Sequence, residues 1–373
     1  MPARPIAWLT LSDIPASVRH FPRNSGFYSI VELTTMQNNA KGLRQAVTQL
    51  IDNYGRKIEY VRISVTDRCD LRCNYCMPVG FKDYREPANW LTFAEITRLA
   101  KVMCEAGTRR IRLTGGEPLL RRNLPDLVAS LRQETSVKDI SLTTNATRLP
   151  RFARQLKDAG LNRINISLDS LKREKVAEIC GRDVLDQVIA GIDSALDAGL
   201  APVKINMVVM PGVNEDEIDA MFQFCRDRGL MLRMIETMPM GHTALEAGTV
   251  SLQPILEKLR NDHGLIPLIA ELGGGPARYW QTPDGKTKVG VITPISQHFC
   301  ATCNRIRLAV DGTIYLCLGQ EEKIEMRELL RSNPGDDAII RQALSEGIHL
   351  KPERHHFREA PEKIVRFMSQ TGG

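Results

Sequence analysis

Two groups of three cysteines are the residues in this sequence best suited to chemistry. The first group has spacing CxxxCxxC, and the second has CxxC followed, after thirteen intervening residues, by a third thiol: Cys69, Cys73 and Cys76, then Cys300, Cys303 and Cys317. Each group is one ligand short of the four that close a structural metal site. Because an open metal position can bind a substrate or cosubstrate, the sequence predicts chemistry on two bound molecules.

The other three cysteines, Cys104, Cys180 and Cys225, are scattered, and we expect them in the core. Clustered cysteines in a chain without a secretory signal indicate metal or redox chemistry rather than disulfides. Zinc is an alternative for either group. In the second group it would need a fourth ligand, for which His298 is a candidate.

Six short apolar or β-branched runs alternate with helical patterns after residue 57. The predicted strands are Tyr60–Thr66, Arg110–Thr114, Ile140–Thr144, Arg163–Leu168, Val203–Met210 and Met231–Ile235. Glycines are expected to end four helices, at Gly107, Gly160, Gly199 and Gly229. This alternation predicts an α/β fold with a parallel sheet, and six strands favour an incomplete (βα)6 barrel over a doubly wound sheet.

Polar motifs follow five of these strands directly. The first cysteine group follows the first strand, and the others are Gly115–Pro118, Thr143–Asn145, Ser167 with Asp169, and Glu236–Met238. Barrel active sites are assembled at the carboxyl ends of the strands. We therefore expect these motifs to meet at one site.

The pattern changes after residue 250, and three regions are predicted: an extension at 1–54, a partial barrel at 55–250 and an auxiliary-cluster region at 251–373. Asp284–Gly285 and Asp311–Gly312 each predict a hairpin. The second hairpin would return Cys317 to Ile306, close to Cys303. The extension could be a targeting segment or could precede a true start at Met36, and the sequence leaves this open.

The composition favours a small anionic ligand. The chain has 373 residues, 43% of them apolar, and a net charge of +6, which falls short of a nucleic-acid-binding protein. No run of apolar residues reaches membrane-spanning length, and a cytoplasmic protein is expected. Arg62, Arg112 and Lys204 interrupt apolar strands, where an unpaired charge is costly, so they predict a site for phosphate.

Several stretches together resemble one known family. They are RISVTDRC, CNYCMP, RLTGGEPLLRR, LTTNATRL, RINISLDSL, VKINMVVMPGVN, FCATCNRIRL and the terminal GG. They are similar to the GTP 3′,8-cyclases of molybdenum cofactor biosynthesis, which belong to the radical S-adenosylmethionine (SAM) superfamily. The resemblance runs from about Gly55 to the end, while the stretch before residue 45 departs from it. Thr237 also stands before Met238, where the family often has an aromatic residue.

The resemblance implies two [4Fe–4S] clusters, one on each cysteine group. The first would bind SAM, with contacts from Tyr75, Gly116, Ser167 and Met238, although Met238 could equally be a core residue. Cleavage of SAM would give a 5′-deoxyadenosyl radical that takes hydrogen from C3′ of GTP. The expected product is (8S)-3′,8-cyclo-7,8-dihydroguanosine 5′-triphosphate.

The second cluster would anchor the guanine of GTP. Further GTP contacts implied by the resemblance are Arg62, Arg112, Thr143, Lys204, Arg305, Ile306 and Arg307. Arg305 and Arg307 are also expected to be catalytic, as are Gly372 and Gly373 if the tail enters the active site rather than fraying. Implied partners are an external electron donor and cyclic pyranopterin monophosphate synthase, with the enzyme a monomer or homodimer. A peptide-modifying radical SAM enzyme and a zinc scaffold are the alternatives.

Overall fold

The computed structural model describes residues 49–77, 86–240, 248–269, 272–357, 359, 364 and 366–372. The chain divides into two units, Met1–Gln45 and Ala46–Gly373, and everything below concerns the second. The alternatives for the extension lie almost wholly outside the described residues. The three domain boundaries remain predictions.

The described residues contain twelve strands, which form a single sheet. The six that follow one another through the barrel are β1 (Tyr60–Ser64), β2 (Arg110–Thr114), β3 (Asp139–Thr144), β4 (Arg163–Ser167), β5 (Val203–Val209) and β6 (Met231–Glu236). The later strands are β7 (Ile266–Leu268), β8 (Arg278–Gln281), β9 (Lys288–Ile292), β10 (Arg305–Leu308), β11 (Thr313–Tyr315) and β12 (Lys323–Glu325). Their order is β12-β11-β10-β1-β2-β3-β4-β5-β6-β9-β8-β7.

Strands β1 to β6 are parallel neighbours in sequence order, which confirms the predicted (βα)6 barrel. A doubly wound sheet would instead reverse its strand order at one point. The later part of the chain extends both edges of this barrel sheet, because β10 pairs in parallel with β1 and β9 pairs in parallel with β6. Each predicted barrel strand lies within two residues of the observed one.

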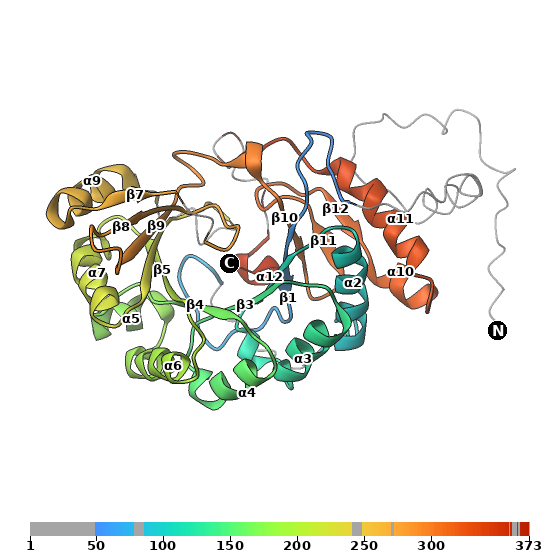
Figure 1. Cartoon of the computed structure of the whole chain (residues 1–373), viewed down its shortest axis with the longest axis horizontal. Helices are drawn as coiled ribbons and strands as arrows, with labels where there is room; N and C mark the ends of the chain where they lie inside the picture. Colours follow the sequence, from blue (N-terminus) through green and yellow to red (C-terminus); the bar gives the residue numbers. More distant parts are fainter. Residues whose placement is uncertain are drawn as a thin grey trace, which may run out of the picture. The chain divides into compact units, whose positions relative to one another are not determined.

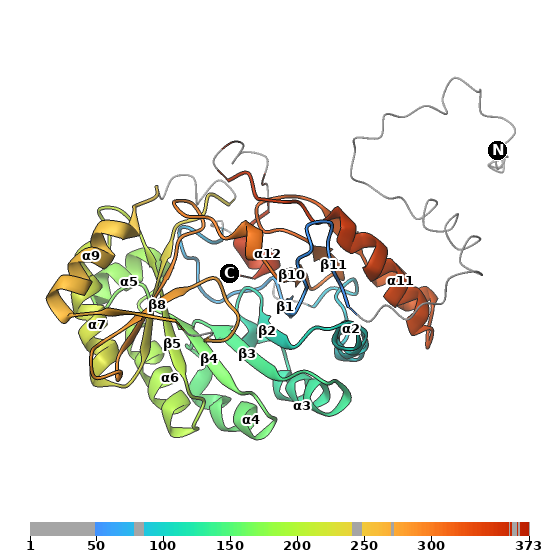
Figure 2. The same cartoon turned by 45° about the horizontal axis from the view of Figure 1, so that its top comes forward.

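Helices cover the outer face of the barrel (Figures 1 and 2). The barrel helices are α2 (Phe93–Glu105), α3 (Leu124–Glu134), α4 (Ala153–Asp158), α5 (Arg173–Cys180), α6 (Leu185–Asp197) and α7 (Ile218–Asp227). The later helices are α9 (Leu252–His263), α10 (Arg327–Ser332), α11 (Asp337–Gly347) and α12 (Met368–Thr371). Short 3-10 helices are η4 (Pro118–Leu120), η5 (Leu149–Arg151), η6 (Glu215–Glu217), η7 (Cys300–Thr302) and η8 (Ile348–Leu350).

Local sequence signals explain where these helices begin and end. At the start of α2, the Thr92 hydroxyl accepts from Glu95 N at 3.2 Å while the Glu95 carboxylate accepts from Thr92 N at 2.7 Å. This reciprocal pair satisfies amide groups that a helix leaves open at its first turn. The four predicted stop glycines all follow helices and have positive φ angles, between +65° and +101°, as expected for helix termination.

The two faces of the barrel strands differ sharply in chemistry. In β1, Val61 and Ile63 are buried in the hydrophobic core, while Tyr60 and Arg62 alternate with them. Alternation sends successive side chains to opposite faces of a strand, and the helices cover the outer face, so Tyr60 and Arg62 project inward. Barrel interiors are usually filled by branched apolar side chains. A charged inner face therefore indicates a place for a ligand.

Both predicted hairpins are confirmed. Strands β8 and β9 pair antiparallel around Asp284–Gly285, and β10 and β11 pair antiparallel around Asp311–Gly312. In the second hairpin Arg307 pairs with Tyr315, and continuing this register puts Cys317 opposite Arg305, one residue from the predicted partner. Among the described residues, no helix has the length and apolarity to cross a bilayer.

Candidate active site

The first cysteine group lies on the loop that follows β1. Its three free thiols are partly buried: Cys69, Cys73 and Cys76. Two backbone hydrogen bonds fix the loop to the end of α5, from Arg72 N to Cys180 O at 2.9 Å and from Asn74 N to Ile179 O at 3.0 Å. The strand and the helix therefore hold the three thiols on one short, anchored loop.

These thiols are suited to a group bound through thiolates. Burial raises the pKa of Cys76 to about 12 and also raises that of Cys69, while a hydrogen bond with Cys180 and burial raise the pKa of Cys73. A metal that binds here must displace the thiol protons. No three Cys, His, Asp or Glu side chains in the described residues are placed to hold a single metal ion. Thiolates of a four-iron cluster bind different iron atoms, so the three-thiol set is compatible with such a cluster.

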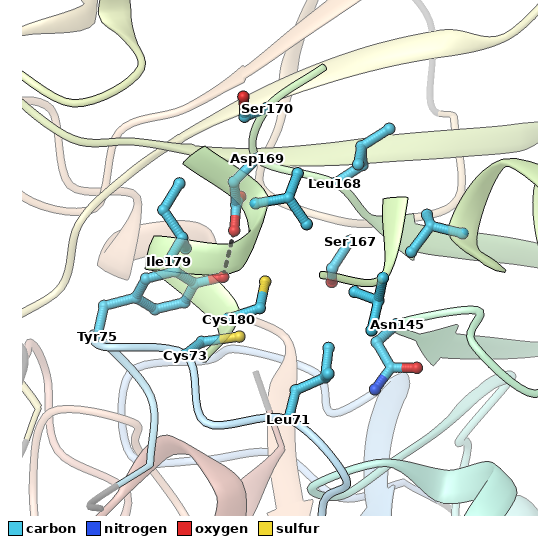
Figure 3. Close-up of a pocket in the computed structure, with 13 residues that line it drawn as sticks. Leu71, Cys73, Tyr75, Asn145, Ser167, Leu168, Asp169, Ser170, Ile179 and Cys180 are labelled. Carbon is cyan, nitrogen blue, oxygen red and sulfur yellow. Dashed lines mark hydrogen bonds between the residues drawn. The ribbon is translucent and has the colours of Figure 1, made fainter. Parts of the chain in front are cut away.

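A pocket lies beside this loop, next to the ends of β3 and β4 and helix α5 (Figure 3). The Tyr75 hydroxyl donates to one Asp169 carboxylate oxygen at 2.7 Å, and Val208 N donates to the other at 2.8 Å. Burial raises the pKa of Asp169 to about 6. Ser167 and Cys180 also line the pocket. Two of the four residues predicted to contact SAM, Tyr75 and Ser167, therefore share one pocket with the Cys73 thiol.

The glycine pair after β2 packs directly against the cysteine loop. A Cβ atom at Gly116 would lie 2.2 Å from Arg68 O, and one at Gly115 would lie 2.3 Å from Thr66 O. Gly115 also has a φ of +149°, which side chains disfavour. Gly116 N donates to Thr66 O at 2.9 Å. In this structure Gly116 therefore positions the loop, and it does not line the pocket of Figure 3.

Glu117, which sequence reasoning did not single out as a site residue, connects the glycine motif to β3. Its fully buried carboxylate accepts from Thr144 Oγ1 and Asn145 N at 2.7 Å, and from Leu119 N at 2.9 Å. Burial and then the charge of Asp70 raise its pKa to about 7. Asn145 Nδ2 in turn donates to Asp70 Oδ1 at 2.8 Å. This network ties the ends of β2 and β3 to the first cysteine group.

The inner face of the sheet carries a set of cations that we call the cationic cluster: Arg62, Arg112, Lys204, Arg305 and Arg307. The register places Arg307, Arg62 and Arg112 side by side on the neighbouring strands β10, β1 and β2. Burial lowers the pKa of both Arg112 and Arg307 to about 10. Neighbouring strands lie about 4.8 Å apart, so these like charges repel one another and a nearby anion would be stabilised. Thr143 Oγ1 lies 3.4 Å from the side-chain amide of Asn165, whose oxygen accepts from Arg112 Nη1 at 2.6 Å.

Two further buried arginines on the inner face were missed by sequence reasoning. Arg163 donates to Asp139, with its Nε 3.0 Å from Oδ1, and Arg233 donates from Nε to Asn206 Oδ1 at 2.9 Å. Both arginines act electrostatically on Lys204. Both could have been predicted from the signal used for Arg62, a charged residue that interrupts an apolar strand.

Lys204 is 1% exposed, and its ionisation is strongly altered. Burial, followed by the charges of Arg233 and Arg163, lowers its pKa to about 6. Its Nζ donates to Leu272 O at 2.8 Å and to the Tyr279 hydroxyl at 3.3 Å. The lysine is therefore mostly neutral at pH 7 without a ligand, and a nearby anion would restore its charge.

The second cysteine group lies where η7, β10 and β11 meet, with thiols at Cys300, Cys303 and Cys317. Lys351 Nζ lies 3.8 Å from Cys303 Sγ and donates to Arg305 O at 3.0 Å and Leu316 O at 2.5 Å. Burial raises the pKa of Cys303, but the charges of Arg305 and Lys351 outweigh it and lower the pKa to about 6. Cys317 interacts electrostatically with Cys303, as the predicted hairpin requires. A thiolate at neutral pH is the form that binds a metal.

The tail of the chain enters the barrel. Helix α12 packs against β1, and Thr371 is fully buried (Figure 1). A Cβ atom at Gly372 would lie only 2.1 Å from Thr114 Cγ2, at the end of β2. Gly372 is therefore packed at the site rather than frayed. Gly373 lies outside the described residues.

Comparisons with known proteins give a consistent result. Residues 63–225 match the family model of the radical SAM superfamily, and residues 230–357 match that of Molybdenum Cofactor Synthesis C. A GTP 3′,8-cyclase of Ectopseudomonas mendocina is 44% identical over 329 residues, covering 87% of this chain and 99% of the relative. One from Marinobacter nauticus is 44% identical over 330 residues, with the same coverage of both chains. The chain belongs to the GTP 3′,8-cyclase family.

Solved structures show the same fold as this GTP 3′,8-cyclase family member at low sequence identity. Streptococcus suis SuiB bound to S-adenosylmethionine has a TM-score of 0.54 at 14% identity, covering 83% of this chain and 75% of that one. SuiB bound to its precursor peptide SuiA has a TM-score of 0.55 at 15% identity with the same coverage. These likenesses support the radical SAM barrel assigned here and say nothing about the substrate.

The structure gives the surroundings of two further residues that were predicted for the GTP 3′,8-cyclase site. Ile306 is buried in the hydrophobic core, on the face opposite Arg305 and Arg307, so only its backbone could reach a ligand. Met238 packs with Cys76 against a small apolar cluster that includes Met368. The core alternative for Met238 therefore stays open.

Residues outside the main assignments also have clear positions. The ring of His298, the candidate zinc ligand, lies edge-on to His355 with 5.9 Å between centroids. Cys104 and Cys225 are buried, as expected of core residues, but Cys180 is only partly buried and lines the pocket. Cys180 also packs against the hydrophobic core, so the expectation of a core residue holds for it only in part.

Proposed function

We propose that this protein converts GTP to (8S)-3′,8-cyclo-7,8-dihydroguanosine 5′-triphosphate, the first step of molybdenum cofactor biosynthesis. The observation that carries the proposal is the cationic cluster, because the strands that carry it adjoin both open cysteine groups. Strand β1 carries Arg62 and leads into the first group, while β10 carries Arg305 and Arg307 and lies between Cys303 and Cys317 of the second. The named relatives, at 44% identity over nearly their whole length, support the same reaction.

The two cofactor sites are proposed from the residues present. Cys69, Cys73 and Cys76 would hold one [4Fe–4S] cluster, and the pocket with Tyr75 and Ser167 would hold SAM, with Gly116 and Met238 as further SAM contacts. When bound, these groups supply the 5′-deoxyadenosyl radical chemistry that removes the C3′ hydrogen of GTP. The loop anchored on α5 and the Glu117 network would hold the thiols and the pocket in fixed relation.

The residues of the chain would bind and orient GTP. The cationic cluster would meet the triphosphate, and Lys204 would gain a proton as the anion enters. Thr143 would add a polar contact. Cys300, Cys303 and Cys317 would hold a second [4Fe–4S] cluster that binds the guanine end, positioned by Lys351. Gly372 and Gly373 would close the site from the tail.

The same cations argue against the peptide-modifying alternative. Buried arginines side by side on the neighbouring strands β10, β1 and β2 are suited to a triphosphate and have no evident task with a neutral peptide. The proposal also implies an external reductant to start each turnover and a cyclic pyranopterin monophosphate synthase to consume the product.

Anaerobic incubation with GTP, SAM and dithionite tests the proposal. We expect 5′-deoxyadenosine and a cyclised nucleotide, both measured by mass spectrometry, from protein that contains about eight iron atoms per chain in two four-iron clusters. Zinc in place of iron, or 5′-deoxyadenosine formed only with a peptide, would contradict it.

A further inference from the structure

Tyr60, the first residue of β1, carries a buried hydroxyl without a partner. Its side chain is 2% exposed, and no group in the described part of the chain forms a hydrogen bond with the hydroxyl. Buried polar groups are nearly always paired, and leaving one unpaired costs stability. The position of this tyrosine therefore suggests a partner that arrives with a ligand.

The surroundings of Tyr60 are almost entirely cationic. In the sheet it pairs with Arg305 of β10 on one side and with Arg110 of β2 on the other. The Arg112 guanidinium lies 5.5 Å from the centre of its ring. Burial raises the pKa of Tyr60, but the charges of Arg112 and Arg62 outweigh this effect and lower it. The hydroxyl thus lies within the field of the cationic cluster.

The chemistry of these neighbours leaves the Tyr60 proton without an acceptor. A guanidinium has five donors and no acceptor, so it can donate to the phenol oxygen but cannot receive its proton. Two other donors on this face, Arg163 Nη1 and Arg307 Nε, are also buried and have no partner among the described residues. All three atoms require an acceptor that the described side chains do not provide. A phosphate oxygen is such an acceptor.

We propose that the Tyr60 hydroxyl donates a hydrogen bond to a phosphate oxygen of the bound nucleotide. The proposal rests on the proposed function and deepens it, because it makes Tyr60 a specificity residue for phosphorylated nucleotides. Tyr60 is not among the GTP-contacting residues that the family resemblance implies.

Tyr60→Phe removes the hydroxyl and keeps the ring. We expect the dissociation constant for GTP, measured by anaerobic equilibrium dialysis with the iron-loaded enzyme, to rise by about tenfold, as for the loss of one hydrogen bond to a charged group. The dissociation constant for guanosine, which lacks phosphate, should stay within about twofold of wild type. Tyr54→Phe, at a position 52% exposed, serves as the matched control and should leave both unchanged.

Thermal stability separates a binding role from a structural one. A buried hydroxyl with no partner does not stabilise the free protein, so ligand-free Tyr60→Phe should melt at the same temperature as wild type or higher. A lower melting temperature, an unchanged GTP affinity, or an equal loss for GTP and guanosine would each overturn the proposal. Failure of the wild-type enzyme to bind GTP would instead contradict the proposed function.

Discussion

The buried Lys204 ionises very differently in the folded and the unfolded chain. Burial and its arginine neighbours lower its pKa from 10.5 to about 6. Between these two values the unfolded chain holds a proton that the folded chain lacks, so the ligand-free protein gains stability from this residue as pH rises. Lys204→Met should therefore raise the melting temperature near pH 7 and flatten its increase towards pH 10.

The matched control for this prediction is Lys101→Met, at an exposed position on α2. It should leave the dependence of melting temperature on pH unchanged, because this side chain is exposed to solvent and lies outside the cationic cluster. A lower melting temperature for Lys204→Met at pH 7 would show that the buried lysine stabilises the free protein, contrary to this account.

Cys180 and Cys73 are neighbours with different expected roles. Both line the pocket and they share a hydrogen bond, yet only Cys73 belongs to the three-thiol loop. Cys73→Ser should lower the iron content of anaerobically prepared protein by about four atoms per chain, since one cluster loses a ligand. Cys180→Ser should retain the iron and its paramagnetic resonance signal after reduction. Equal loss of iron in both variants would make Cys180 a ligand.

The glycine loop between β7 and β8 controls the positions of two arginines. A Cβ atom at Gly273 would lie 2.6 Å from Arg163 Nη2, and one at Gly274 would lie 2.7 Å from Arg110 Nη1. Alanine at either site should therefore displace a guanidinium beside the cationic cluster. We expect the KM for GTP to rise by about tenfold in each variant, equivalent to the loss of one good contact, measured in initial-rate assays.

Two other glycines, Gly285 and Gly275, serve as controls that separate displacement of an arginine from backbone strain. Gly285 has a φ of +71° but open space around it, and Gly275 has open space and an ordinary φ. Gly285→Ala should lower the melting temperature, as we also expect for Gly273→Ala, without changing the KM for GTP. Gly275→Ala should change neither. A KM that follows the melting temperature across all four variants would rule out the proposed control of arginine position.

The elements were largely predictable from sequence because their signals are local. Strand period, helix-ending glycines and Asp-Gly turns gave all six barrel strands and both hairpins close to their observed positions. The parallel pairing of β10 with β1 was not predictable, since it joins segments more than 240 residues apart by side-to-side contact alone.

The site residues divide in the same way: those with a local sequence signal could be predicted, and those placed by long-range contacts could not. The six cysteines could be found because such clusters are rare outside metal sites. The inward cations could be found because a charge is costly in an apolar strand. Lys351 could not, because its place beside Cys303 depends on how a segment 48 residues later folds back. Ile306 was assigned with its arginine neighbours, but strand alternation turns its side chain to the opposite face.

At the scale of the whole molecule, the two cysteine groups should have separable tasks. Replacing the three cysteines of the first group with serine should abolish formation of 5′-deoxyadenosine from SAM. Replacing those of the second group should preserve some SAM cleavage while abolishing the cyclised nucleotide and weakening GTP binding, because the barrel and its SAM pocket remain intact. Anaerobic assays with quantified products compare the two. Equal loss of SAM cleavage in both would contradict the division of labour.

Deuterium transfer from the substrate tests the central claim most directly. The wild-type enzyme, SAM and a reductant are incubated anaerobically with GTP deuterated at C3′, and 5′-deoxyadenosine is analysed by mass spectrometry. The account predicts that 5′-deoxyadenosine gains deuterium in step with formation of the cyclised triphosphate. Deuterium-free 5′-deoxyadenosine formed together with the cyclised product would contradict it.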